Sequence, residues 1–325
     1  MGAKAAVIGG GTGSFMVLSG LKNYISNLTA LVSMADDGGS TGQLRDELGV
    51  LPPGDVRQCL VALARSPKVR DLFSFRFESG SFKGQTFGNL FLAATEKMTG
   101  DFRASMELAT EVLEVAGRVE PVTLDKVTLL MQDGDKVVRG EHLIDDGIFT
   151  VRRPELWLEP TPAVNLEALA AIKDADLIII APGSLYTSLG AALVVPGVGE
   201  ALSKSKAKKI YICNLMNKPG QTDGFTVQDY ASELERMAGT RFLDYVIYNT
   251  KRPSDELLKK YAADGELPIE LDEKTKTRYK LRGTELLADE IWGGVSKSDP
   301  LAKSRTLIRH NSDLMARKIM QIYFS

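Results

Sequence analysis

The sequence predicts an α/β protein with a Rossmann-like, doubly wound, mostly parallel sheet and a small β-hairpin insert. Short apolar segments alternate with amphipathic segments along most of the 325 residues, the pattern of repeated β-α-β units. Turns rich in glycine or asparagine directly follow several apolar segments, as at the carboxyl ends of parallel strands. One antiparallel pair of segments interrupts this alternation, within 121–160. We expect a single domain over 1–325 that contains this hairpin insert.

The N-terminal part of the chain opens with a strand that is apolar almost throughout, as expected for a strand covered on both faces. Pro53 and Asp55 mark the start of a later helix, since proline and acidic residues favour the first helical turn. The last helix of this part repeats apolar residues about every 3.6 positions. We expect strands at 3–10 and 28–35, a polar loop at 36–43, and helices at 14–24, 44–48, 52–65, 87–99 and 101–117.

The middle of the chain contains the hairpin, whose arms meet at Asp133-Gly134, a dipeptide typical of tight β-turns. The alternation of helices and strands then returns, and a polar region at 251–300 shows only a weak pattern. We expect a helix, a very hydrophobic strand and a glycine turn within 164–184, strands at 208–214 and 242–250, and helices at 227–238, 254–263 and 311–322.

Composition excludes several classes of function. The net charge of −2 gives no electrostatic basis for general binding to nucleic acid or to anionic membranes. No apolar run reaches the length of a membrane span, and the N-terminus lacks a signal-peptide pattern. Cys59 and Cys213 lie in apolar contexts, which favours buried free thiols in a cytoplasmic protein. Two histidines exclude a histidine-rich metal centre but not a carboxylate-bound Mg²⁺.

A glycine-rich turn follows the first strand and opens the first helix, the layout in which backbone amides hold a phosphate. Gly9, Gly11 and Gly13 do not match the dinucleotide fingerprint, because Ser14 stands where a third spaced glycine or alanine belongs. No Gly-Lys-Ser/Thr follows, so the turn is not a P-loop either. It predicts a phosphorylated ligand; the alternative is that the glycines serve only close packing. The binding residues predicted here are Gly10, Gly11, Thr12 and Gly13.

Two adjacent acids end the second strand, where an acid often meets a ribose hydroxyl in nucleotide-binding folds. Asp36 and Asp37 precede Gly-Gly-Ser-Thr-Gly, and together they are candidate ligands for Mg²⁺ beside a diphosphate. The following residues, with Ser40 and Thr41, are a candidate second anion nest. Taken alone, the segment is typical of a solvated turn, and its place at the same sheet edge as the first glycine turn favours a binding site.

Further polar residues lie where later elements begin or end. Arg57, in the first turns of its helix, is a candidate phosphate clamp or an ordinary ion-pair partner. Asn89 lies near the start of another helix. Gly183, Ser184 and Asn214 follow buried strands, at the edge where open α/β sheets bind ligands. The convergence on one edge of the turns 9–13, 36–42, 183–187 and 214–217 is the main physical argument for a binding site.

Nothing in the sequence indicates a nucleophilic triad, since there are two histidines and no G-x-S-x-G motif. His310 stands beside Arg309 just before the last helix, either near the site or as part of a surface pair. Asn311 is placed to cap that helix.

Seven segments in the same order resemble the YvcK-type gluconeogenesis factor family, within the superfamily of CofD-like 2-phospho-L-lactate transferases. The resemblance is dense over 4–250, sparse over 251–306, and returns at 307–322. We therefore regard 251–306 as a divergent, lid-like region. The segments are VIGGGTG, MADDGGSTGQLRDEL, PPGDVRQCLVAL, FGNLFLAA, DLIIIAPGSLYTS, KSKAKKIYICNLM and LIRHNS.

The resemblance implies a Rossmann-like fold and a nucleotide-sugar ligand of the UDP-N-acetylglucosamine kind. It also implies a role in cell shape and envelope growth on gluconeogenic carbon sources. Tyr261 and Arg309 match family positions that contribute to nucleotide-sugar binding. The family commonly has Arg-His-Asp-Thr where this chain has Arg309, His310, Asn311 and Ser312, so the motif lacks its acid here.

Three functions follow as hypotheses. The first is a cytosolic nucleotide-sugar-binding regulator. The second is a Mg²⁺-dependent transferase that moves a phospholactyl-type group from a nucleoside diphosphate donor, with Asp36 or Asp37 holding the metal. The third, a NAD-dependent oxidoreductase, is weakened by the glycine spacing. The sequence leaves open whether the chain forms a homo-oligomer.

Overall fold

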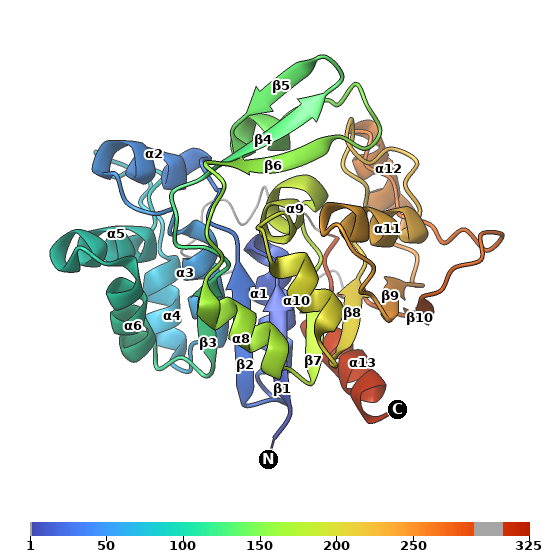
Figure 1. Cartoon of the computed structure of the whole chain (residues 1–325), viewed down its shortest axis with the longest axis horizontal. Coiled ribbons are helices and arrows are strands. Elements are labelled where there is room, and N and C mark those ends of the chain that lie inside the picture. Colours follow the sequence, from blue (N-terminus) through green and yellow to red (C-terminus); the bar gives the residue numbers. More distant parts are fainter. Residues whose placement is uncertain (1, 289–307) are drawn as a thin grey trace.

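The computed structural model describes residues 2–288 and 308–325. Its main sheet has seven strands, all paired in parallel, in the order β10-β9-β8-β7-β1-β2-β3 (Figure 1). The chain order reverses between β1 and β7, which makes that junction the switch point where such sheets bind ligands. This confirms the predicted doubly wound sheet. The strands are β1 (Lys4–Ile8), β2 (Asn27–Val32), β3 (Arg118–Pro121), β7 (Leu177–Ile180), β8 (Lys208–Ile212), β9 (Tyr245–Asn249) and β10 (Lys280–Thr284).

Helices cover both faces of the sheet. Neighbouring side chains of a strand point to opposite faces, so strands that are apolar throughout need a helix layer on each side. In β1, Val7 joins the core under one helix layer, and Ala6 and Ile8 join the core under the other. The first layer comprises α1 (Gly11–Leu21), α3 (Gly54–Leu63), α4 (Pro67–Ser74), α5 (Phe87–Thr99), α6 (Phe102–Leu113) and α13 (Ser312–Phe324). The second comprises α8 (Leu166–Asp174), the π-helical turn η1 (Leu185–Leu189), α9 (Gly190–Leu193), α10 (Val198–Lys204) and α11 (Val227–Met237).

The predicted hairpin is part of a three-stranded antiparallel sheet in the order β5-β4-β6. Asp133 pairs with Lys136, and Gly134 takes the left-handed conformation that the tight turn requires, with φ +60°. The third strand, β6, was not predicted. Figure 1 shows this small sheet across the carboxyl ends of the main strands, while both termini lie at the opposite end. Its elements are β4 (Thr128–Asp133), β5 (Lys136–Arg139), α7 (Glu141–Asp145) and β6 (Glu155–Glu159).

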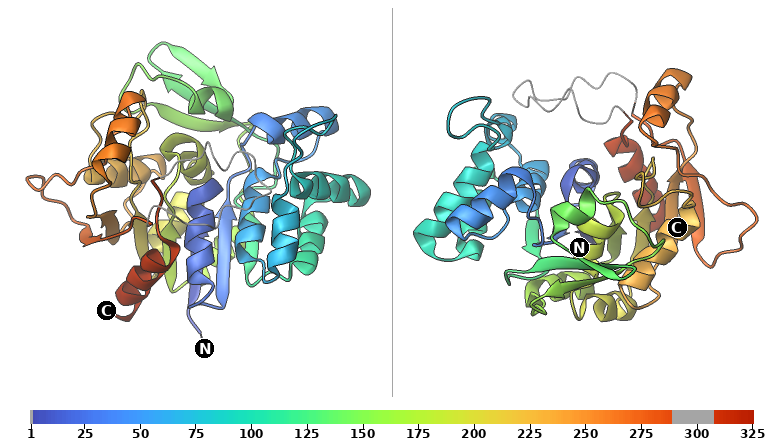
Figure 2. Two further views of the ribbon diagram at one scale, coloured as in Figure 1. Left: turned by 180° about the vertical axis from the view of Figure 1, so that it is seen from behind. Right: turned by 90° about the horizontal axis from the view of Figure 1, so that it is seen from above.

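Two remaining helices flank this carboxyl edge. Figure 2, viewed from above, shows the helices of residues 39–113 gathered on one side and α12 on the other. They are α2 (Gly39–Leu48) and α12 (Asp255–Ala263). The lid-like region expected at 251–306 falls partly on 289–307, outside the described residues.

Several local predictions were wrong in ways that have a physical reason. The polar loop expected at 36–43 ends at Gly38, the N-cap from which α2 begins. Gly and Ser lower helix propensity, but here they form a first turn that packing holds in place. The strand β3 and the helices α4, η1, α9 and α10 were not predicted, because short elements carry little periodic signal.

Among the described residues, no single helix is long and apolar enough to cross a membrane. One bent pair, Leu185–Leu193 with Val198–Lys204, passes the same test of length and composition when taken together. Cys59 and Cys213 are buried free cysteines, as predicted.

Candidate functional site

A cavity of about 400 Å³ opens at the carboxyl ends of β1, β7 and β8, at the switch point of the sheet. Loops after these strands form much of its wall, and the segment before α13 closes another side. Three of the four predicted turns therefore meet here: 9–13, 183–187 and 214–217. The predicted residues that line the cavity are Thr12, Gly13, Gly183, Ser184, Asn214, Tyr261 and Arg309.

The glycine turn combines close packing with an open helix N-terminus. A Cβ at Gly13 would lie 1.7 Å from the carbonyl oxygen of Pro182, and one at Gly10 would lie 1.8 Å from Oδ2 of Asp55. Close packing therefore requires a glycine at both positions, and ligand binding by the turn stays a prediction. Gly10 is also the N-cap of α1 and has no side chain to cap it. The first N–H groups of α1, beside the cavity at Thr12 and Gly13, therefore lack an intrahelical acceptor.

The carboxylate of Asp55 takes one of these donors. Its Oδ1 accepts a 2.8 Å hydrogen bond from the backbone N–H of Gly11. Burial, and then the neighbouring charge of Asp36, raise the pKa of Asp55 to about 7. In the sequence Asp55 is marked only as a helix-start acid, and no local signal indicates a contact with a residue 44 positions away.

Asp36 and Asp37 face different neighbours. Asp37 accepts a 2.8 Å hydrogen bond from the N–H of His142, which ties the end of β2 to the small sheet. Asp36 accepts a 3.0 Å bond from the N–H of Gly38, and burial raises its pKa. The hydroxyl of Thr41, another predicted site residue, also forms a hydrogen bond with the Asp36 carboxylate.

The metal site predicted at Asp36 and Asp37 stays a prediction. Within residues 2–288 and 308–325, no group of three or more His, Cys, Asp or Glu side chains could hold a metal ion. Asp36 instead lies beside Asp55, close enough to raise its pKa. Mg²⁺ is often held by one or two carboxylates together with the phosphates of a ligand. Asp36 and Asp55 fit that requirement, whereas Asp37 is committed to His142.

Arg57 and Asn89 form a buried pair that does not line the cavity. The Nε of Arg57 donates a 2.8 Å hydrogen bond to Oδ1 of Asn89. Gly88 permits this approach, since a Cβ there would lie 2.7 Å from Cδ of Arg57. Ser40 lies in the first turn of α2, outside the cavity.

Asp145, at the end of α7, is a cavity residue that the sequence analysis did not identify. Its Oδ1 accepts hydrogen bonds from Oγ of Ser184 at 2.6 Å and from Oγ1 of Thr187 at 2.8 Å. The Nζ of Lys218, also unpredicted, lies 2.5 Å from the same oxygen. Burial raises the pKa of Asp145, but the hydrogen bonds from Lys218 and Ser184 outweigh it and hold the pKa below its ordinary value.

Another acid of α7 lies close by. Burial, and then the charges of Asp36 and Asp145, raise the pKa of Glu141 to about 8. Three carboxyl groups with raised pKa values, those of Asp36, Asp55 and Glu141, therefore lie at this edge. Such perturbed groups are common at functional sites.

Asn214 joins the two strand ends that border the cavity. Its Nδ2 donates to the carbonyl oxygen of Gly183 at 2.7 Å, and its Oδ1 accepts from the Gly183 N–H at 3.1 Å. This reciprocal pair fixes the turn after β7 against the end of β8. Both residues were predicted from the sequence, and their pairing was not.

The segment before α13 forms the remaining wall. The hydroxyl of Tyr261 accepts a 3.1 Å hydrogen bond from the N–H of Ile308, and the Tyr261 side chain is buried. His310 is buried rather than part of a surface pair, with Nε2 3.1 Å from the carbonyl oxygen of Cys213. Asn311 caps α13 as predicted, accepting from the N–H groups of Asp313 and Leu314 at 3.0 and 3.1 Å.

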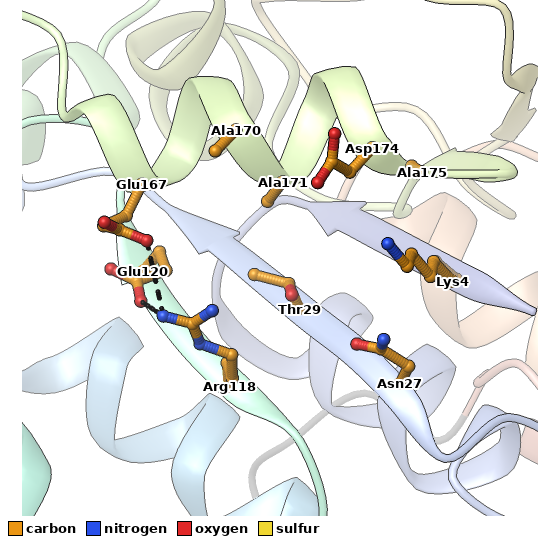
Figure 3. Close-up of a pocket in the computed structure, with 11 residues that line it drawn as sticks. Lys4, Asn27, Thr29, Arg118, Glu120, Glu167, Ala170, Ala171, Asp174 and Ala175 are labelled. Carbon is orange, nitrogen blue, oxygen red and sulfur yellow. Dashed lines mark hydrogen bonds and ion pairs between the residues drawn. The ribbon is translucent and has the colours of Figure 1, made fainter.

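A second, smaller pocket of about 140 Å³ lies at the opposite, amino edge of the sheet (Figure 3). It lies between the strand starts and α8, and at one side Arg118 pairs with Glu120 and Glu167 at 3.3 and 3.4 Å. None of the predicted site residues lines it. The same holds for two further pockets among the described residues, of about 730 and 550 Å³. The cavity at the carboxyl edge, which predicted site residues do line, is therefore the candidate site.

A sequence model of the family described as 2-phospho-L-lactate transferase CofD matches residues 5–291. The chain belongs to the CofD family. This CofD-family member is also 42% identical to a putative gluconeogenesis factor of Thermotoga maritima, over 98% of this chain and 99% of the relative. It is 39% identical to the gluconeogenesis factor of Bacillus subtilis, over 98% of each chain.

A solved structure supports the fold of this CofD-family member. The crystal structure of a Bacillus halodurans protein superposes with a TM-score of 0.88 at 36% identity, covering 98% of this chain and 100% of the other. The predicted resemblance to the gluconeogenesis factors is thereby confirmed.

Proposed function

We propose that this protein binds a nucleotide sugar of the UDP-N-acetylglucosamine kind in the cavity between β1, β7 and β8. We further propose that it acts in the cytosol as a regulator that links the level of this ligand to cell shape and envelope growth on gluconeogenic carbon sources. One observation carries the proposal: a single cavity combines a helix N-terminus whose N-cap glycine has no capping side chain, cationic side chains and an apolar wall.

The diphosphate belongs at the N-terminus of α1. The N–H groups there lack helical acceptors, and the helix dipole favours an anion at this end. Lys218 and Arg309 line the same cavity and supply positive charge. Ser184 adds a hydroxyl donor at the turn after β7.

The base or sugar belongs against the apolar wall of the cavity. Leu215, Met216 and Tyr261 line the cavity there and pack in one small cluster. Because the Tyr261 hydroxyl is bonded to the backbone of residue 308, the ring is held in one orientation. An aromatic face held in this way suits stacking with a flat ligand group.

Isothermal titration calorimetry with UDP-N-acetylglucosamine tests this function. We expect saturable binding to the wild-type chain and affinity reduced roughly tenfold or more in Tyr261→Leu, which loses the stacking face. Tyr24→Leu is the matched control, since Tyr24 is 44% exposed and does not line the cavity. No heat at millimolar ligand with the folded wild-type chain would refute the proposal.

A transferase activity is the second candidate, favoured by the family match over 5–291 and by the Asp36–Asp55 pair. Mg²⁺ held there would neutralise charge on the leaving phosphate of a nucleoside diphosphate donor. The assay is Mg²⁺-dependent consumption of a guanosine diphosphate-linked phospholactyl donor in the presence of a deazaflavin acceptor. We expect Asp36→Asn to abolish turnover and Asp46→Asn, exposed on α2, to retain it. No turnover in the wild-type chain would exclude this candidate.

A further inference from the structure

We propose that Lys218 and Ser184 form a subsite for a phosphate group of the ligand, and that the Asp145 carboxylate is the internal anion with which this phosphate competes. The inference rests on the proposed function only in that the ligand carries phosphate. In this proposal, Lys218 pairs with Asp145 when the subsite is empty and with the phosphate when it is filled.

The donors at Asp145 are arranged as they would be around a phosphate oxygen. Ser184, Thr187 and Lys218 all direct a donor to the same carboxylate oxygen, within 2.5–2.8 Å. Charge-assisted bonds of this kind are the ones that phosphate oxygens make with hydroxyl and ammonium groups. Ser184 and Lys218 also line the cavity, whereas Thr187 is buried beneath it.

The main chain around Asp145 is anchored independently of these donors, by the side chain of Gln221. The side-chain amide of Gln221 donates to the carbonyl oxygens of Ile144, Asp145 and Gly147, at 2.9, 2.8 and 3.1 Å. The end of α7 is therefore anchored to the segment that carries Lys218. The carboxylate stays at the cavity wall when its donors turn to another anion.

A comparison with Asp55 shows why Asp145 is the exchangeable acid. Both carboxylates bond to groups of turns that the sequence predicts to bind phosphate. Asp55 lies against Gly10, where a Cβ would come within 1.8 Å of its Oδ2, and its carboxyl group is buried. The side chains of Asp145 and Lys218 are 36% and 34% exposed, so water and ligand reach both. Lys218 can turn from the carboxylate to a phosphate with a small movement of its flexible stem.

Removal of the negative charge of Asp145 tests the inference, because it should strengthen the binding of a phosphate. Asp145→Asn keeps the size and one acceptor oxygen but removes the negative charge beside Lys218. We expect inorganic pyrophosphate, measured by calorimetry, to bind roughly tenfold more tightly to this variant, as for one unit charge removed near a partly exposed anion. Asp146→Asn is the matched control; that side chain is 70% exposed, contacts His142, and should leave the affinity unchanged.

Lys218→Met supplies a second, independent measurement that does not depend on the folding of the Asp145 variant. We expect it to weaken pyrophosphate binding roughly tenfold. Lys204→Met is its control, since Lys204 forms an equally short ion pair with Glu200 on the exposed surface of α10. Unchanged or weaker binding by a folded Asp145→Asn, or unchanged binding by Lys218→Met, would overturn the inference.

The same titrations separate this inference from the proposed function. Binding of UDP-N-acetylglucosamine to the wild-type chain with no gain in Asp145→Asn retains the function and rejects the subsite. Pyrophosphate binding that rises in Asp145→Asn, with no binding of the nucleotide sugar, retains the subsite and rejects the function. Absence of pyrophosphate binding in both chains rejects the subsite.

Discussion

The carboxylate of Asp55 accepts a 2.8 Å hydrogen bond from the backbone N–H of Gly11, so an acid from the start of α3 closes the first turn of α1. The favourable end of a helix dipole would stabilise its charge. Burial outweighs this effect and raises the pKa of Asp55 to about 7. The hydrogen bond at the glycine turn therefore involves a carboxyl group that gains or loses its proton near neutral pH.

Gly10→Ala should destabilise the protein by about 1–3 kcal/mol, the usual cost of overpacking. The added Cβ would lie 1.8 Å from Asp55 Oδ2, and α3 must shift to relieve the clash. Gly38→Ala is a matched control, because Gly38 is also an N-cap glycine with extended backbone and its Cβ would have no neighbour closer than 3.5 Å. Urea denaturation compares the two; equal stability would show that Asp55 does not require Gly10.

Asp55→Asn should change how stability depends on pH. The folded-state pKa of about 7 lies above the ordinary 3.8, so between these values the unfolded chain loses its proton first. The free energy of unfolding of the wild-type chain therefore falls as pH rises through this interval. The variant lacks this loss, and should gain roughly 2–4 kcal/mol relative to wild type between pH 4 and pH 8.

Urea denaturation at both pH values, in buffer with a metal chelator, measures this change. A variant whose stability parallels that of the wild-type chain across the interval would show that the carboxyl group of Asp55 has an ordinary pKa.

His310 should remain neutral far below the usual range. Burial lowers its pKa from 6.5 to about 4, although the bond to the Cys213 carbonyl opposes the shift. Because the unfolded chain takes up this proton first, the free energy of unfolding should fall as pH drops from 6.5 towards 4. The chain has two histidines, so His142→Gln leaves one ring signal for NMR titration. A midpoint near 6.5 would contradict the buried geometry.

Asn214→Asp should weaken both the fold and ligand binding. The carboxylate cannot donate to the Gly183 carbonyl, which costs about 1–3 kcal/mol of stability, and its charge repels a phosphate in the cavity. Asn249→Asp is the control: Asn249 donates to the Lys251 carbonyl at 2.6 Å at the end of β9 and does not line the cavity. Both variants should unfold more easily, and only Asn214→Asp should lose affinity, by roughly tenfold. Equal affinities would remove Asn214 from the site.

Prediction from the sequence succeeded where a signal is local. The alternation of apolar and amphipathic segments predicts the doubly wound sheet, and the glycine or asparagine turns after β1, β7 and β8 predict residues that line the cavity. Asn311 was identified as a cap because capping involves residues two and three positions away.

The failures concern contacts between distant segments. Asp145 and Lys218 are 73 positions apart in the sequence and meet only because α7 of the small sheet folds over the carboxyl edge. Arg57 has the side chain of a phosphate clamp, but α5 places Asn89 against it. The pair of adjacent acids gave no sign that Asp37 accepts a hydrogen bond from the N–H of His142, 105 positions away.

The sequence by itself determined the fold class, the family resemblance and the edge of the sheet where polar turns gather, because periodicity and turn chemistry are properties of neighbouring residues. Only the tertiary structure decided which charges meet there. Burial and long-range packing place Asp55 on Gly11, and Asp145 on Lys218 and Ser184. The energy of a charge depends on its surroundings in three dimensions, and the order of residues along the chain does not contain them.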